Sequence, residues 1–219
     1  MVRLFSIFEF VSSFDIRISS FSVNATDFIT VVTGLPRSGT SLMMQMLNAG
    51  GIRPLTDQVR APDESNPRGY FEFEPVKRLR TDRSWLVRAC GHAVKIIYLL
   101  VPELPSDGRF RYRLILMKRP MKEIVASQRI MLEREGKSGV DEAALARVYE
   151  MQLLQFEEWL RVQPDFATVG VNYHDALEKP DAVARNVNDF LGGGFDVAAM
   201  ARVVDRGLYR QRASFPSKE

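Results

Sequence analysis

A chain of 219 residues, 46% of them hydrophobic, is long enough to bury the core of one α/β domain. Its formal net charge of +3 suits an anionic small molecule better than duplex nucleic acid, which usually requires a concentrated basic stripe. One cysteine and two histidines exclude a disulfide framework and argue against a metal site built from Cys or His. We therefore expect a small anionic ligand, no nucleic-acid partner and no resident metal.

The first 27 residues are rich in aromatic residues and serine, and charged residues such as Arg3 and Glu9 interrupt every apolar run. This pattern fits neither a transmembrane segment nor a signal peptide. Residues 1–27 are therefore expected to be an N-terminal extension: an edge hairpin, a loosely packed segment or an overlong start to the reading frame. Residues 28–219 are expected to form a single domain, and the protein is expected to be cytoplasmic.

A strand, a glycine-bearing loop and a helix follow one another in the sequence ITVVTGLPRSGTSLMMQMLNA, residues 29–49. Gly34 and Gly39 allow the backbone to approach an anion closely. The helix begins directly after the loop, so its first N–H groups and its dipole favour negative charge at the same place. The stretch predicts an anion-binding loop, made by Pro36, Arg37, Ser38, Gly39, Thr40 and Ser41.

The loop differs from the P-loop of nucleoside triphosphatases at one position. Thr40 stands where the P-loop has a lysine after Gly39, and the cation is Arg37 instead. A γ-phosphoryl group is normally handled with Mg²⁺ and that lysine, whereas a sulfonyl group carries one negative charge fewer. A nucleotide or small-molecule kinase is one alternative function, but it requires the lysine and an aspartate for Mg²⁺ at a strand end, and neither is visible.

Downstream of this loop, helical and strand patterns alternate along the chain. Prolines and polar residues predict an irregular segment over 52–74, and Pro75 is expected to start a helix that continues to about Ala89. Further strands are predicted over 93–100, 112–117 and 166–171, with helices over 121–134, about 145–160 and 180–191 and a short one before the polar tail. The alternation predicts a three-layer, P-loop NTPase-like α/β fold with a central parallel sheet flanked by helices.

Ligands of such sheets bind beyond the carboxyl ends of the strands. Residues 34–41, Lys95 and Arg119 all lie at predicted strand ends of this kind. The topology therefore predicts that these cationic residues converge on one site.

The residues LPRSGTS, 35–41, resemble the 5′-phosphosulfate loop of sulfotransferases that use 3′-phosphoadenosine 5′-phosphosulfate (PAPS), and most closely the arginine form of the protein-tyrosine and carbohydrate enzymes. Arg119, with Ser127 eight residues later, resembles the pair that binds the 3′-phosphate in this family. The segment 171–180 is similar to a family segment whose tyrosine, here Tyr173, lies near the adenine. The resemblance covers about residues 29–191. It implies a sulfotransferase that moves the sulfonyl group of PAPS to a hydroxyl or amine acceptor. Because a sulfonyl group carries less charge, Arg37 and the backbone amides could hold it without a metal.

The resemblance also implies catalytic roles. Lys95 resembles the lysine of protein-tyrosine sulfotransferases at the equivalent strand, and with Arg37 it would stabilise charge on the bridging oxygen. Related enzymes place a glutamate base in the segment after the first helix, where this chain has Glu64, Glu72 and Glu74. We favour Glu72 because Phe71 and Phe73 flank it and would partly bury it; His92 is the outside candidate.

The chain departs from the family in its last residues. The C-terminal Arg-Lys-Gly signature of the cytosolic enzymes is absent, and Arg210 or Arg212 is the candidate to replace it at the cofactor. A PAPS-fold binding protein that lacks an effective base is a second alternative function. The acceptor, whether glycan, lipid, protein tyrosine or small metabolite, is an unidentified partner.

Overall fold

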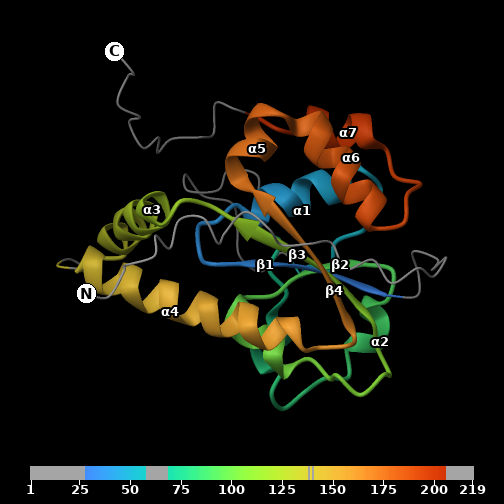
Figure 1. Cartoon of the computed structure of the whole chain (residues 1–219), viewed down its shortest axis with the longest axis horizontal. Coiled ribbons are helices and arrows are strands. Elements are labelled where there is room, and N and C mark those ends of the chain that lie inside the picture. The colour runs from blue at the N-terminus through green and yellow to red at the C-terminus, as the bar shows by residue number, and fades with distance from the viewer. Residues whose placement is uncertain (1–27, 58–68, 138, 140, 206–219) are drawn as a thin grey trace, which may run out of the picture.

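The computed structural model of this chain describes residues 28–57, 69–137, 139 and 141–205. These residues form a four-stranded parallel sheet with helices on both faces (Figure 1). The architecture confirms the predicted α/β fold with a central parallel sheet. The N-terminal extension and three candidate site residues, Glu64, Arg210 and Arg212, lie outside the described residues.

The strands lie in the order β2–β1–β3–β4, and every pair is parallel. Their bounds are β1 Ile29–Gly34, β2 Ala93–Lys95, β3 Tyr112–Lys118 and β4 Phe166–Asn172. The register pairs Gly34 of β1 with Met117 of β3. Because β2 and β3 flank β1 on opposite sides, the strand order reverses beside β1, where ligands of open α/β sheets bind.

The helices connect and cover these strands. They are α1 Thr40–Ala49, α2 Leu86–Ala89, α3 Met121–Arg134, α4 Glu142–Arg161, α5 Tyr173–Glu178, α6 Pro180–Phe190 and α7 Val197–Arg202, with 3₁₀ helices η2 Glu74–Arg78 and η3 Tyr98–Glu103. None of the helices in the described part of the chain combines the length and the hydropathy that a membrane span requires.

Two apolar clusters lie on opposite faces of the sheet, because successive residues of a strand point to opposite sides. Val31 belongs to the cluster formed with η2, α2, η3 and α4, whereas Val32 belongs to the cluster formed with α1, α6 and α7. In Figure 1, α1, α6 and α7 lie above the sheet and α4 and α2 below it. Each cluster packs one face of the sheet against helices, which gives the three layers that the sequence predicts.

The end of α1 is covered by α7, which comes about 150 residues later in the chain. Met200 of α7 packs so closely on Gly50 that a Cβ at Gly50 would lie 2.5 Å from the Met200 Cγ atom. The backbone N–H of Asp196 donates to the Gly50 carbonyl at 3.1 Å. Helix α1 is therefore held in place by the last described helix.

Two predicted elements are wrong in their extent. The helix expected from Pro75 to Ala89 is broken into η2 and α2, because Asp82 accepts hydrogen bonds from the backbone N–H and the hydroxyl of Ser84 at 3.0 and 2.7 Å. The strand expected over 93–100 ends at Lys95 and is followed by η3. Lys95 pairs with Val32, so β1 has little strand left beyond that point to pair with a longer β2.

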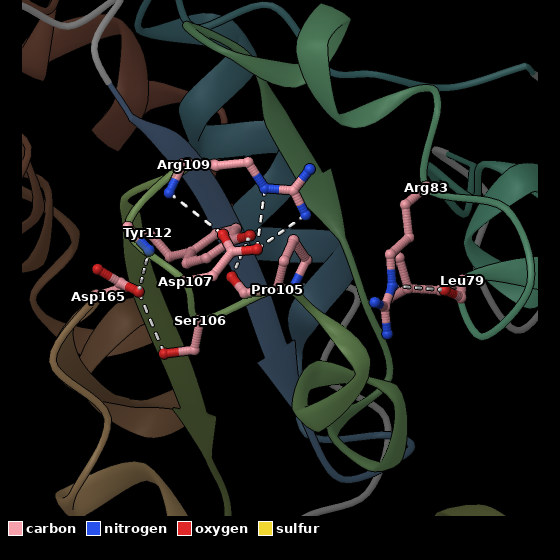
Figure 2. Close-up of polar contacts among 9 residues, drawn as sticks. Leu79, Arg83, Pro105, Ser106, Asp107, Arg109, Tyr112 and Asp165 are labelled. Atoms are coloured by element: carbon pink, nitrogen blue, oxygen red, sulfur yellow. Dashed lines mark hydrogen bonds and ion pairs between the residues drawn. The ribbon is translucent and has the colours of Figure 1, made fainter.

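The amino edge of the sheet is closed by the loop before β3 (Figure 2). The Tyr112 hydroxyl donates to the Pro105 carbonyl at 3.0 Å, and burial raises the pKa of Tyr112. The Asp165 carboxylate accepts from the Ser106 hydroxyl at 3.2 Å and from the Gly108 N–H at 3.1 Å. These bonds join the starts of β3 and β4 to the loop, so the Tyr112 hydroxyl and the Asp165 carboxylate both have hydrogen-bond partners.

Candidate functional site

The loop between β1 and α1 is a tight, strained turn at the carboxyl edge of the sheet. The Ser38 N–H donates to the Leu35 carbonyl at 3.1 Å. Arg37 has a φ of 67° and Gly39 a φ of 103°, in the left-handed region that costs a residue with a side chain roughly 1–2 kcal/mol. Arg37 therefore adopts a conformation that the loop, and not its own preference, imposes.

The loop also approaches β3 very closely. A Cβ at Gly34 would lie 2.5 Å from the Ser38 Oγ and 2.7 Å from the Met117 carbonyl oxygen, so only glycine fits there. Gly34 thus allows the loop to pack closely against β3, beside the point at which the strand order reverses.

The start of α1 has the features of an anion site. Gly39 provides no side-chain cap, and the first N–H groups of a helix lack intrahelical acceptors. The hydroxyl oxygens of Thr33 and Ser38 are buried and have no hydrogen-bond partner among the described residues. A buried polar group left in this state costs about 1–3 kcal/mol, so these atoms suit a polar ligand.

Arg119 and Ser127 both contact this loop, although they are distant from it in sequence. Arg37 Nε donates to the Ser127 Oγ at 2.9 Å. Arg119 Nη1 donates to the Arg37 carbonyl at 3.1 Å. Arg119 directly follows β3, Pro120 is the N-cap of α3, and Ser127 lies in the second turn of that helix. Two motifs that the sequence analysis treats separately therefore meet at Arg37.

Tyr173 lies between the loop and Arg119. A Cβ at Gly39 would lie 2.3 Å from the Tyr173 Cδ2, so the ring packs on the glycine backbone. The Arg119 guanidinium lies 4.7 Å from the centre of the same ring, within cation–π range. Burial raises the pKa of Tyr173, which keeps its hydroxyl neutral. Tyr173 begins α5, a helix that the sequence analysis does not predict.

Two side chains that the sequence analysis does not assign to the site complete this group. Glu123 Oε2 accepts from Arg119 Nε at 2.8 Å, and the Glu123 side chain is only 2% exposed. His174 Nε2 lies 3.0 and 3.1 Å from the two carboxylate oxygens of Glu123. The four-residue spacing of Arg119 and Glu123 is the signal that would have indicated their ion pair. The contact of His174 has no local signal, because α5 and α3 are distant in sequence.

Lys95 and Glu72 form a second group at the end of β2. Lys95 Nζ donates to the Tyr70 carbonyl and lies 3.9 Å from Glu72 Oε1. Both side chains are largely buried, with 16% and 27% of their surfaces exposed. Phe71, directly before Glu72, has a φ of 52°, which is unusual for an aromatic residue and marks a strained backbone. The structure thus brings together the predicted lysine and the favoured base.

The other candidate bases have different surroundings. Glu74 is paired with Lys77 at 2.5 Å and is 44% exposed. His92 precedes β2, at the opposite edge of the sheet from Lys95, and its Nδ1 lies 3.0 Å from the Cys90 carbonyl oxygen. Among the described residues, no group of three or more His, Cys, Asp or Glu side chains is arranged to hold a metal ion.

We compared the sequence and the structure of this chain with those of known proteins. No family model matches the sequence, and no curated protein matches it. Solved structures do match: mouse sulfotransferase SULT7A1 complexed with PAP has a TM-score of 0.52 and 15% sequence identity, over 90% of this chain and 71% of that one. The sulfotransferase domain from the curacin biosynthetic pathway has a TM-score of 0.49 and 13% identity, over 84% of this chain and 78% of that one. The likeness to the mouse protein shows that the chain has the sulfotransferase fold.

Proposed function

We propose, from the fold that this chain shares with sulfotransferases, that it transfers the sulfonyl group of PAPS to a hydroxyl or amine acceptor. The observation that carries the proposal is that two motifs which resemble nucleotide-binding motifs meet at Arg37, through Ser127 and through Arg119. The absence of a lysine after Gly39 favours a sulfonyl group over a γ-phosphoryl group.

The nucleotide is proposed to bind across the carboxyl edge of the sheet. The loop N–H groups and the buried Ser38 hydroxyl would hold the 5′-phosphosulfate, where the helix dipole also favours an anion. Arg119 and Ser127 would hold the 3′-phosphate, and the Tyr173 ring would lie near the adenine. A planar guanidinium is suited to this task because it binds phosphate oxygens in a forked arrangement.

The proposed reaction is an in-line displacement at sulfur. A lone pair of the acceptor atom forms a bond to sulfur while the bond from sulfur to the bridging oxygen breaks. The bridging oxygen keeps that electron pair and leaves as part of adenosine 3′,5′-bisphosphate. Arg37, Lys95 and the loop N–H groups would stabilise the charge on the leaving oxygen, and Glu72 would accept the acceptor's proton.

Calorimetry with adenosine 3′,5′-bisphosphate, in the presence of excess chelator, tests the binding half of the proposal. We expect saturable binding, and weaker binding of adenosine 5′-monophosphate, which lacks the 3′-phosphate. Undetectable binding of the bisphosphate at millimolar concentration would overturn the proposal.

A transfer assay tests the chemical half. We expect ³⁵S from labelled PAPS to appear on one member of a mixed set of hydroxyl and amine acceptors, and Glu72→Gln to abolish most of that transfer. Bisphosphate binding without any transfer would favour the alternative of a PAPS-fold binding protein. Transfer of a phosphoryl group from labelled ATP in the same mixture would favour the kinase.

A further inference from the structure

We propose that Glu123 and His174 are positioning residues for Arg119, and that binding of the nucleotide 3′-phosphate is coupled to protonation of His174. The inference rests on the proposed function, because it requires a phosphate beside Arg119. It goes further by adding two residues and a proton to the binding step.

Within the described part of the chain, three contacts hold the Arg119 guanidinium. Glu123 Oε2 accepts from its Nε at 2.8 Å, and the Arg37 carbonyl accepts from its Nη1 at 3.1 Å. The Tyr173 ring lies against its face, 4.7 Å from its central carbon. A guanidinium is planar, so two hydrogen bonds in its plane and one contact on its face fix its orientation. Glu123 is therefore one of the groups that set the direction in which Arg119 presents its donors.

Glu123 is itself held by His174, whose Nε2 lies 3.0 and 3.1 Å from the two carboxylate oxygens. The carboxylate is 2% exposed, so it is poorly screened by water, whereas the His174 side chain is 25% exposed and can exchange a proton with solvent. Histidine is the side chain that ordinarily changes charge between pH 5 and 8. His174 is thus placed to report pH to a buried acid next to the proposed phosphate site.

A phosphate bound at Arg119 would lie near the buried Glu123 carboxylate, and the two anions repel each other. A proton on His174 offsets part of that repulsion, so phosphate binding and protonation favour each other. Thermodynamic linkage requires this effect to be reciprocal. The sign follows directly: the bound complex holds more protons than the separate partners, so affinity rises as the pH falls and is lost as the pH rises.

Other charged and titratable groups surround His174 and have to be separated from its effect. Among the described residues they are Glu123 on α3, which His174 contacts, and Arg119, which bonds to Glu123 and to the carbonyl of Arg37. Tyr173 and Asp175 are the chain neighbours of His174 on α5. The phosphate titrates too, with a second pKa of about 6, and this acts in the opposite direction because the dianion binds better. His174→Gln retains all of these groups and can still donate an amide N–H to Glu123, so it removes only the imidazole titration.

The experiment measures affinity for adenosine 3′,5′-bisphosphate by calorimetry at pH 6.5, 7.5 and 8.5. One linked proton can change affinity by up to tenfold per pH unit, and we expect the wild-type affinity to fall by roughly three- to tenfold between pH 6.5 and 8.5 relative to His174→Gln. His92→Gln, which changes the histidine at the opposite edge, is the matched control and should retain the wild-type profile. Parallel profiles of wild type and His174→Gln would overturn the inference.

A second measurement keeps the inference testable if His174→Gln does not fold. Binding to the wild-type protein, repeated in buffers of different ionisation enthalpy, reports the protons taken up on binding. We expect net uptake near pH 7 with the bisphosphate and less uptake with adenosine 5′-monophosphate; equal uptake with both ligands would overturn the inference. If the bisphosphate does not bind at any pH, the proposed function itself fails, which is a distinct result.

Glu123→Gln separates the charge of Glu123 from its role as the acceptor that positions Arg119. The amide oxygen can still accept from Arg119, but the negative charge is gone. We expect an affinity for the bisphosphate that is equal to or higher than that of the wild type and no longer varies with pH in the wild-type manner. A loss of affinity for both nucleotides, with the pH profile unchanged, would mean that Glu123 acts only on the fold.

Discussion

The two edges of the sheet are built from the same four strands but are completed in opposite ways. At the amino edge, the hydroxyl of Tyr112 and the carboxylate of Asp165 bond to the loop that covers them (Figure 2). At the carboxyl edge, the buried hydroxyls of Thr33 and Ser38 have no partner among the described residues. Arg37 there adopts a left-handed conformation. The polar side chains at the amino edge therefore make hydrogen bonds that stabilise the fold, whereas two buried hydroxyls at the carboxyl edge make none within the described residues.

The acidic residues of the two edges make the same contrast. Asp165 accepts from a backbone N–H and a serine hydroxyl close to it in space, and so closes a loop. Glu123 instead contacts two side chains that carry or can carry positive charge, Arg119 and His174. The carboxylate of Asp165 thus bonds to neutral donors, whereas that of Glu123 bonds to side chains that are, or can become, cationic.

The largest expected effect follows from removing the cation of the loop. Arg37→Ala should lower turnover of PAPS by roughly 10²–10³-fold, by comparison with the loss of an oxyanion-stabilising donor, and should weaken bisphosphate binding far less. Arg37→Lys should be milder, because the charge survives while the planar fork is lost. The measurement is kcat for sulfonyl transfer with bisphosphate affinity alongside. Near wild-type turnover of the alanine variant would show that the chemistry lies elsewhere.

The second-largest effect, a loss of nucleotide affinity, is expected from replacing Arg119 or Ser127, the two residues that bond to Arg37. Arg119→Ala and Ser127→Ala should each remove a hydrogen bond to the 3′-phosphate, and charged hydrogen bonds contribute about 1.5–3 kcal/mol. The arginine change should therefore cost roughly tenfold or more in bisphosphate affinity. Binding of adenosine 5′-monophosphate, measured by the same titration, should change little. Equal losses for both nucleotides would contradict the assignment.

A matched pair of glycine variants compares the edges directly. Gly39 and Gly108 both have positive φ angles, of 103° and 80°, but a Cβ at Gly39 would overlap the Tyr173 ring whereas a Cβ at Gly108 meets no atom within 4 Å. Gly108→Ala should cost roughly 1–2 kcal/mol of stability from backbone strain alone. Gly39→Ala should cost more and should also weaken nucleotide binding. Denaturant unfolding and calorimetry measure the two effects, and equal behaviour of the variants would refute the comparison.

The smallest effect is expected at the amino edge. Tyr112→Phe leaves the buried Pro105 carbonyl without its donor and should lower the free energy of unfolding by about 1–2 kcal/mol. Nucleotide affinity and turnover should not change, because Tyr112 begins β3 at the edge opposite the loop. Urea unfolding and calorimetry check this. A loss of affinity without a loss of stability would break the division between the edges.

Much of the fold could be predicted because its signals are local. Alternating and continuous apolar runs indicate β1, β3 and β4, and Pro120 correctly marks the start of α3. The extents of β2 and of the segment after Pro75 could not be predicted in this way. The end of β2 depends on where its neighbour β1 turns away, and the break near Asp82 depends on a side chain that competes with the helix.

The site shows the same limit. The loop around Arg37 and the spacing of Arg119 and Ser127 are sequence patterns, so they could be identified directly. The left-handed conformation of Arg37 and the contact of His174 with Glu123 arise only when α3, α5 and the loop pack together. No local preference of a histidine indicates that its partner lies 51 residues away.

The packing of Met200 on Gly50 has a consequence for the synthesis of the protein. The loop and α1 leave the ribosome early, but α7, which holds the end of α1, is made about 150 residues later. Contacts between such distant segments form slowly, because a long stretch of chain must be ordered before they can be made. A nascent chain that ends before α7 would therefore contain the complete anion-loop sequence, but its helix α1 would lack the packing of Met200 on Gly50. The nucleotide binding proposed above should consequently appear late in translation, once α7 has been made.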